Sequence, residues 1–312
     1  MKQEPFKIVE INSFENFEEE IMNIRRNREP RFTVFRGQAS NKWNLIPSLF
    51  RKSVEAGNVK LSDLKNLFIE EYTNVGQFVR SGDQMGFSIP GLIYPFLNFK
   101  KIEDVKLDEW VNHESPYIEA IALAQHHGVK TRLLDFSYDA YTSLYFAANS
   151  SFQMNRQNTS PAGFFSLWMI DGFYLHSPDC KTKMIHTSVE SNHYLRAQKG
   201  LFISFPNPFE ENIEINRDCT EKDYDLLAFM VDDNNGIAKD GNGHKKLFPV
   251  IYRFDFPEKQ SADIIRKLDS RGFNLISLMP NLDNIEIYNR FKNDVNNKWK
   301  EWTPPSSGKF CF

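Results

Sequence analysis

The segment from Tyr138 to about Ser150 is predicted to form a helix that is apolar on nearly every side. Its apolar positions are Tyr141, Leu144, Tyr145, Phe146, Ala147 and Ala148. A helix with this pattern is usually buried in a core, because it has no broad polar face for water. In the sequence, a predicted extended segment at 130–137 precedes this helix and a predicted strand at 163–170 follows it.

Strands and helices are interspersed along the rest of the chain without a regular strand–helix–strand rhythm. Further strands are predicted at 31–35, 201–205 and 248–256, an extended segment at 274–279, and helices at 62–80, 117–127, 190–199, 261–271 and 281–297. This order favours an α+β fold over a doubly wound sheet. We therefore predict a mixed, mainly antiparallel β core with surrounding helices.

Length and composition predict one domain in a reducing compartment. The 312 residues divide into an N-terminal helical extension (1–30), a core (31–206), a loop-rich insertion (207–247) and a C-terminal strand–helix segment that completes the domain (248–312). The three cysteines are far apart and the N-terminus has no apolar signal region. No apolar run is long enough to span a membrane. We expect a cytoplasmic protein with no metal site and no membrane partner.

Arg36, Gly37 and Gln38 end the first core strand with polar groups where core would be expected. Arginine offers a planar charged fork that suits phosphate or carboxylate. Glycine lets a ligand approach the backbone closely. The alternative is an ordinary strand end, with Arg36 in a surface ion pair.

A second polar group spans the end of helix 117–127 and the extended segment after it. Its members are Gln125, His126, His127, Thr131, Arg132 and Asp135. Adjacent histidines on a helix point about 100° apart, so they are poor joint ligands of one metal, but either could be a general base. The alternative is structural: the histidines cap the helix, Arg132 pairs with Asp135, and Ser137 caps the next helix.

A third polar position is Gln198, just before Gly200 and the apolar strand 201–205. The two readings are a site residue and a simple turn from helix to strand.

These stretches resemble one known family. The segments "FRGQ" (Phe35–Gln38) and "AQHHGVKTRLLDFSYDAYTSLYFA" (Ala124–Ala147) are similar to the bacterial and phage FRG-domain family. "RAQKGLFI" (Arg196–Ile203) and "GFNLISLMPNLDNI" (Gly272–Ile285) resemble its later segments. Phe136 stands where the family usually has Trp, and Met279 where it usually has Phe.

A second resemblance, to ADP-ribosyltransferases, implies a reaction. Arg36-Gly37 looks like the strand-ending pair with which these enzymes bind NAD, and "YFA" at Tyr145–Ala147 is similar to the stretch whose tyrosine stacks on nicotinamide. The resemblance implies a divergent split sheet and NAD as cofactor. Arg36 would hold the pyrophosphate, while Gln125, His126 or Thr131 would bind ribose hydroxyls. Gly200 stands where these transferases carry a catalytic Glu, so either another acid serves, Asp135 or Glu190 a few turns earlier, or the chemistry is different.

The function implied is an NAD-dependent ADP-ribosyltransferase-like toxin or anti-phage defence effector that modifies RNA or a protein. The catalytic candidates are Arg36, His126, His127, Asp135 and Gln198; the cofactor-binding candidates are Arg36, Gly37, Gln38, Gln125, Thr131, Arg132 and Tyr145. A toxin would also imply an inhibitory antitoxin protein in a separate chain. Two alternatives remain: an NAD-independent phosphodiester hydrolase using His126 or His127, and a non-catalytic module that binds a nucleotide or a peptide.

Overall fold

The structure is a computed structural model. It describes residues 6–26, 33–56, 61–91, 94–97, 115, 117–157, 163–175, 182, 184–188, 192–204, 238–239, 245–246 and 251–296. The three cysteines, Glu190 and most of the 207–247 segment lie outside the described residues, so the predictions made for them stay predictions.

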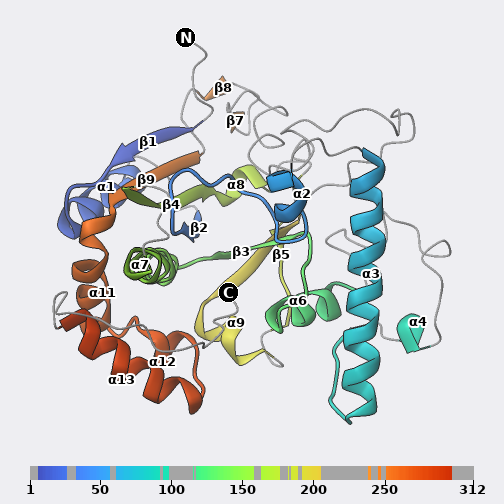
Figure 1. Ribbon diagram of the computed structural model, residues 1–312. Helices are drawn as coiled ribbons and strands as arrows, with labels where there is room; N and C mark the ends of the chain where they lie inside the picture. Colours follow the sequence, from blue (N-terminus) through green and yellow to red (C-terminus); the bar gives the residue numbers. More distant parts are fainter. Residues whose placement is uncertain are drawn as a thin grey trace.

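A seven-stranded sheet runs through the molecule (Figure 1). Its strands, in spatial order, are β1 (Lys7–Glu10), β9 (Ile251–Pro257), β4 (Phe164–Asp171), β2 (Thr33–Gln38), β3 (Leu133–Ser137), β6 (Gly200–Ser204) and β5 (Met184–Ile185). Only the β1–β9 pair of this sheet is parallel. The predicted α+β class, with a mixed and mainly antiparallel sheet surrounded by helices, is confirmed.

The sheet consists of two halves that share one hydrophobic cluster but little backbone pairing. β2 and β3 are its central neighbours, yet they share the single residue pair Phe35–Ser137. By contrast, β2 pairs with β4 along all six of its residues, and β3 pairs with β6 along all five of its own. The strands β2 and β3 therefore diverge beyond Phe35, where the half β1–β9–β4–β2 meets the half β3–β6–β5.

Two groups of helices cover one face of the sheet. On the β2 side they are α1 (Phe14–Arg26), α7 (Ala140–Arg156), α11 (Ser261–Ser270), α12 (Leu275–Leu278) and α13 (Asp283–Asn296). On the β3 side they are α3 (Leu61–Gln84), α6 (Ile118–His126) and α9 (His193–Ala197). The short elements are α2 (Arg51–Ala56), α4 (Tyr94–Leu97), α8 (Gly172–Leu175), η3 (Glu258–Gln260), β7 (Ala238–Lys239) and β8 (Lys245–Lys246).

Helix α7 is buried against β2, as its apolar sequence predicts. The side chain that begins it is Asp139, which accepts hydrogen bonds from the backbone N–H groups of Tyr141 and Thr142. The prediction that Ser137 caps this helix is wrong, because the hydroxyl of Ser137 instead donates to the carbonyl of Gln198. Ser137 belongs to β3, and the helix starts only after the chain has left the strand.

Gly37 allows α7 to approach β2 closely. A Cβ atom at this position would lie 2.1 Å from the carbonyl oxygen of Ser143 and 2.8 Å from Cβ of Ala147. Both atoms belong to α7, so the space that the glycine leaves is filled by the helix. The close approach expected at Gly37 is real, but the neighbour on this face is protein and not a ligand.

Two other segments differ from the sequence-based expectations. Residues 274–279 are not extended, because Asn274 and Ser277 form reciprocal caps that begin the short helix α12. The N-terminal segment does more than add a helix: β1 extends the sheet and α1 packs on the core. Among the described helices, none has the length and apolar character needed to cross a membrane.

Candidate functional site

Arg36 lies where the two halves of the sheet part. Its position on β2 pairs with Trp168, on the face opposite α7. The guanidinium reaches toward β3, where Nη1 donates to the backbone carbonyl of Asp135 at 2.7 Å and lies 3.8 Å from Oδ2 of the same residue. The side chain is only 13% exposed, and its Nε is buried without a hydrogen-bond partner. Arg36 thus joins the two half-sheets but keeps a donor unused.

Burial sets the electrostatics of Arg36. It lowers the pKa of the guanidinium to about 10, against the opposing effect of Asp135. Arg51 lowers the pKa of Arg36 further, because it adds a second positive charge nearby. Arg36 still carries its charge at neutral pH. A buried cation beside another cation favours an added anion.

The carboxylate of Asp135 is held by a chain of polar contacts. The backbone N–H of Leu133 donates to Oγ1 of Thr131 at 3.2 Å, and the Thr131 hydroxyl donates to Oε1 of Gln125 through a short contact. These bonds fix the amide of Gln125 so that Nε2 donates to Oδ1 of Asp135 at 2.6 Å. Gln125, Thr131 and Asp135 therefore act as one unit, which holds one carboxylate oxygen and leaves the other open.

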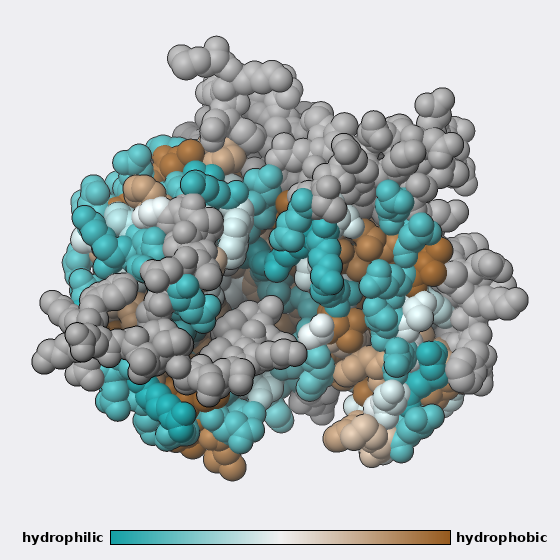
Figure 2. All heavy atoms as spheres, in the orientation of Figure 1, coloured by the Kyte–Doolittle hydropathy of each residue, from teal (hydrophilic) through white to brown (hydrophobic). Residues whose placement is uncertain are grey.

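Asp135 faces solvent in the space between the two groups of helices. Ser137 pairs with Phe35, whose side chain packs under α7, so the two side chains lie on the same face of the sheet. Asp135 is two residues before Ser137 on β3, and its side chain therefore lies on that face too. Its side chain is 66% exposed, although β3 is otherwise buried. Figure 1 shows β3 crossing between α7 and α6, and Figure 2 shows hydrophilic residues over α2 beside a hollow in this part of the surface.

Arg51 is a charged neighbour that is not among the catalytic or cofactor-binding candidates named from sequence. The backbone of Leu49 donates to the carbonyl of Thr131, and Ser48 bonds both the N–H and the carbonyl of Thr131. Arg51 follows two residues later and donates from Nε to the carbonyl of Ile46. Desolvation lowers the pKa of Arg51, while Asp135 and Glu55 oppose that shift. No local pattern signals Arg51, because its position depends on contacts some 80 residues away in the chain.

The two histidines end α6 beside this cluster. Gly128 stops the helix with φ of 89°, and the N–H groups of Gly128 and Val129 bond the carbonyls of Gln125 and Ala124. His126 contacts the Tyr194 ring with centroids 4.5 Å apart, and His127 stacks on another aromatic ring. Desolvation, and then the charge of His127, lowers the pKa of His126 against the effect of Asp135. His126 is therefore mostly neutral at pH 7.

Arg132 lies away from the cluster, inside the helical layer. Its backbone N–H and Nε donate to the two carboxylate oxygens of Glu71 at 2.8 and 2.7 Å, and its guanidinium lies 3.9 Å from the centroid of the Phe68 ring. Both charged side chains are buried, at 1% and 0% exposure. The pairing of Arg132 with Asp135 considered from sequence is wrong: the partner of Arg132 is Glu71, and that of Asp135 is Arg36.

Three other predicted site residues lie elsewhere. The amide of Gln38 accepts from the indole of Trp168 and donates to the carbonyl of Asn44. Gln198 donates to the carbonyl of Leu278 and so ties α9 to α12. Tyr145 lies on the buried side of α7, where it is 1% exposed, and burial raises its pKa. The structure brings together Arg36, Gln125, His126, Thr131 and Asp135, and leaves these three outside that group.

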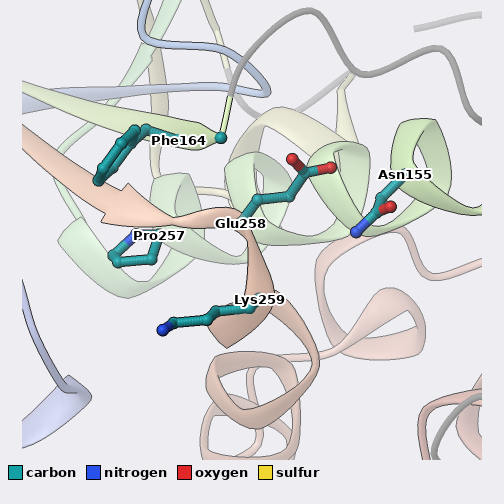
Figure 3. A pocket seen from close by; sticks show the side chains of 6 residues that line it. Asn155, Phe164, Pro257, Glu258 and Lys259 are labelled. Carbon is teal, nitrogen blue, oxygen red and sulfur yellow. The ribbon is translucent and has the colours of Figure 1, made fainter.

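A separate cavity of about 600 Å³ opens between the end of α7, the start of β4 and the β9–η3 junction (Figure 3). Glu258 points toward Asn155 there, and Lys259 points away. The cavity is open and has few converging polar groups, so the Arg36 cluster is the better candidate site. Within the part of the chain that the structure describes, no group of three or more His, Cys, Asp or Glu is arranged to hold a metal ion.

Comparison with known proteins supports one family. Residues 31–156 match the model of the FRG domain, which confirms the family prediction made from the motifs. The chain therefore contains an FRG domain, and this span holds Arg36, the Gln125–Thr131–Asp135 unit and α7. No curated protein and no solved structure matches the chain.

Proposed function

We propose that the protein is an NAD-dependent ADP-ribosyltransferase whose site is the Arg36–Asp135 cluster. The observation that supports this most is the pairing of a mostly buried arginine, with an unused donor, and a carboxylate that is open to solvent. A charged fork suits the diphosphate of NAD. An exposed carboxylate a few ångströms away suits the reacting ribose.

The chemistry asked of this site is the replacement of nicotinamide. The bond from C1′ of the ribose to nicotinamide breaks, and nicotinamide leaves with the bonding electron pair. An oxygen or nitrogen of the acceptor forms the new bond to C1′, and its proton passes to a base. The transition state carries positive charge on the ribose, so a fixed negative charge beside it lowers the barrier.

Asp135 is the residue assigned to that work in this proposal. Its Oδ1 is held by Gln125, so Oδ2 is free to accept a ribose hydroxyl or the acceptor's proton. Position 200 offers no room for the catalytic Glu of the transferases, because a Cβ atom added to Gly200 would lie 2.5 Å from Cδ1 of Leu195. Tyr145 is given no part in binding nicotinamide, since it lies in the core.

The proposal extends to the biological setting that the motifs suggest. The acceptor would be an RNA or a protein, and the activity would be that of a toxin or an anti-phage effector. Such an activity would be controlled by an inhibitory protein encoded as a separate chain. Induced expression with and without a co-expressed neighbouring gene tests this part by its effect on growth.

Labelled NAD tests the reaction itself. The full chain is incubated with host extract and NAD carrying an isotope in its adenylate phosphate, and protein and RNA fractions are counted. We expect label in one fraction, and a loss of about 100-fold in Arg36→Lys, which keeps the charge but not the fork. Lys52→Gln, which removes an exposed charge one residue after Arg51, is the matched control and should keep full transfer. Absence of label from both fractions with the wild-type protein would overturn the proposal.

One observation favours a second candidate. His126 is half-buried and mostly neutral at pH 7, because desolvation lowers its pKa and the charge of Asp135 only partly opposes this shift. These are properties expected of the general base of a phosphodiester hydrolase. RNA or DNA cleavage without NAD, abolished by His126→Gln, would support that function. Binding of a nucleotide without either reaction would indicate a non-catalytic module.

A further inference from the structure

We infer that Arg51 and Arg36 together bind the diphosphate group of the ligand, and that the carboxylate of Asp135 competes with this group for both guanidiniums. This inference rests on the proposed function, because it assigns the diphosphate to part of the same site. It adds a binding residue, Arg51, and gives Asp135 a second effect that opposes ligand binding.

Arg36 is equipped to take an anion oxygen. Nη1 is its one hydrogen-bonding atom with a partner among the described residues, and that partner is a neutral carbonyl. The buried Nε has none. Nε is enclosed by protein, so a ligand would reach this guanidinium through its Nη atoms. Phosphate oxygens match the spacing of the guanidinium donors.

Contacts of the preceding residues place Arg51 near the same cluster. Ser48 and Leu49 bond Thr131, whose hydroxyl bonds Gln125, whose amide in turn bonds Asp135. This series of contacts places the start of α2 beside Asp135. Only Nε of Arg51 hydrogen-bonds within the described part of the chain, to Ile46, so both Nη atoms are available to a ligand.

Asp135 is a loose partner for these cations. Its Oδ2 lies 3.8 Å from Nη1 of Arg36, which is longer than a hydrogen bond, whereas its Oδ1 is 2.6 Å from Gln125. The carboxylate is also mostly exposed, so water weakens the ion pair. A phosphate oxygen that bonds the guanidinium directly can displace this contact at little cost.

The charges in the cluster also favour a ligand with more than one negative charge. Desolvation lowers the pKa of both Arg36 and Arg51 and the charge of Asp135 opposes this shift, while Glu55 lies one helical turn beyond Arg51 on α2. Glu55 is exposed and acts on Arg51 alone of the two arginines. The buried end of the cluster thus keeps an excess of positive charge near Arg36. A diphosphate, which can reach both guanidiniums, complements this arrangement better than a single carboxylate does.

Calorimetric titration with inorganic pyrophosphate and with ADP-ribose tests the inference on the full chain. Arg51→Gln should weaken both ligands by about tenfold. Asp135→Asn should tighten pyrophosphate by roughly fivefold, because it removes the competing charge. Lys52→Gln is the control and should stay within about twofold of the wild-type affinity. Thermal unfolding of each variant verifies that it is folded.

The outcomes separate this inference from the proposed function. Tighter pyrophosphate binding by Asp135→Asn and weaker binding by Arg51→Gln support it even if no label moves from NAD. Unchanged pyrophosphate affinity in Arg51→Gln overturns it even if the wild-type protein transfers label. Weaker pyrophosphate binding by Asp135→Asn overturns the competing role of Asp135. Binding of ADP-ribose but not pyrophosphate assigns recognition to the nucleoside and overturns the diphosphate site.

Discussion

Arg132 and Arg36 are both mostly buried arginines beside a carboxylate, but their partners differ. Glu71 is buried and bonds both the side chain and the backbone of Arg132. Asp135 is exposed, and its carboxylate stays 3.8 Å from Arg36. Each guanidinium has one buried nitrogen without a hydrogen bond, but that of Arg132, Nη2, lies 2.7 Å from the enclosed carboxylate of Glu71. A ligand can replace the loose, exposed partner of Arg36 more readily than the buried partner of Arg132. The comparison assigns stability to Arg132 and ligand binding to Arg36.

The largest expected effect is on stability at the Arg132 pair. Arg132→Met leaves the carboxylate of Glu71 buried without its cation, which should lower the free energy of unfolding by about 3–5 kcal/mol. Urea denaturation measures this. The double variant Arg132→Met, Glu71→Leu should recover much of the loss, because no unpaired charge then remains. A single variant as stable as the wild type would remove the contrast between the two arginines.

The next effect concerns the strand that carries Arg36. Gly37→Ala places a Cβ atom 2.1 Å from the carbonyl of Ser143, so α7 has to move. We expect a loss of about 1–3 kcal/mol in the free energy of unfolding. Gly163→Ala is the matched control, since nothing lies within 4 Å of its added Cβ. Equal stability of the two variants would show that α7 does not require a glycine at position 37.

A smaller loss of stability is expected from Arg36 itself. Arg36→Lys removes the hydrogen bond to the carbonyl of Asp135 and with it one link between the half-sheets. The cost should be about 1 kcal/mol, the usual net value of one hydrogen bond. Urea denaturation beside Arg132→Met gives the comparison directly. A loss as large as that of Arg132→Met would mean that Arg36 is mainly structural.

The smallest effect is a pH dependence at His126. Its pKa is lower in the folded protein than in the unfolded chain, so between the two values the unfolded state binds more protons. The stability from this group is present above the unfolded value of about 6.5 and is lost as pH falls through the folded value. We expect His126→Gln to lose less stability than the wild type when pH is lowered from 7 to 5, as measured by thermal unfolding. Identical losses would contradict the lowered pKa.

Much of the fold is readable from local sequence. The apolar character of residues 138–150 predicts the buried helix α7, and Gly128 marks the end of α6. Capping is less readable where candidates stand close together. Ser137 and Asp139 are both favourable N-cap residues for α7. Asp139 takes this position because β3 continues through Ser137, where it still pairs with β6. Asn274 and Ser277 begin a helix that the apolar residues around them do not reveal.

The candidate site was predictable in part. Gln125, Thr131 and Asp135 are close in sequence, and they also meet in the structure. Arg132 and Asp135 are also close in sequence, but they do not meet in the structure. They stand three residues apart where the chain becomes extended, and side chains at that separation point to opposite sides. The true partners lie 61 residues from Arg132 and 99 from Asp135. Tyr145 lies in the core, and its position could not be predicted because a helix that is apolar all round does not show which side faces a ligand.

The most direct test of the central claim compares label transfer from NAD by Arg36→Lys and Arg132→Lys. Both substitutions keep a positive charge and remove the planar fork. The assay is run at a temperature at which circular dichroism shows both variants folded. We predict that Arg132→Lys retains transfer within about threefold of the wild type and that Arg36→Lys loses about 100-fold. Transfer that is equal in the two variants, or lost in Arg132→Lys alone, would contradict the assignment of binding to Arg36 and of stability to Arg132.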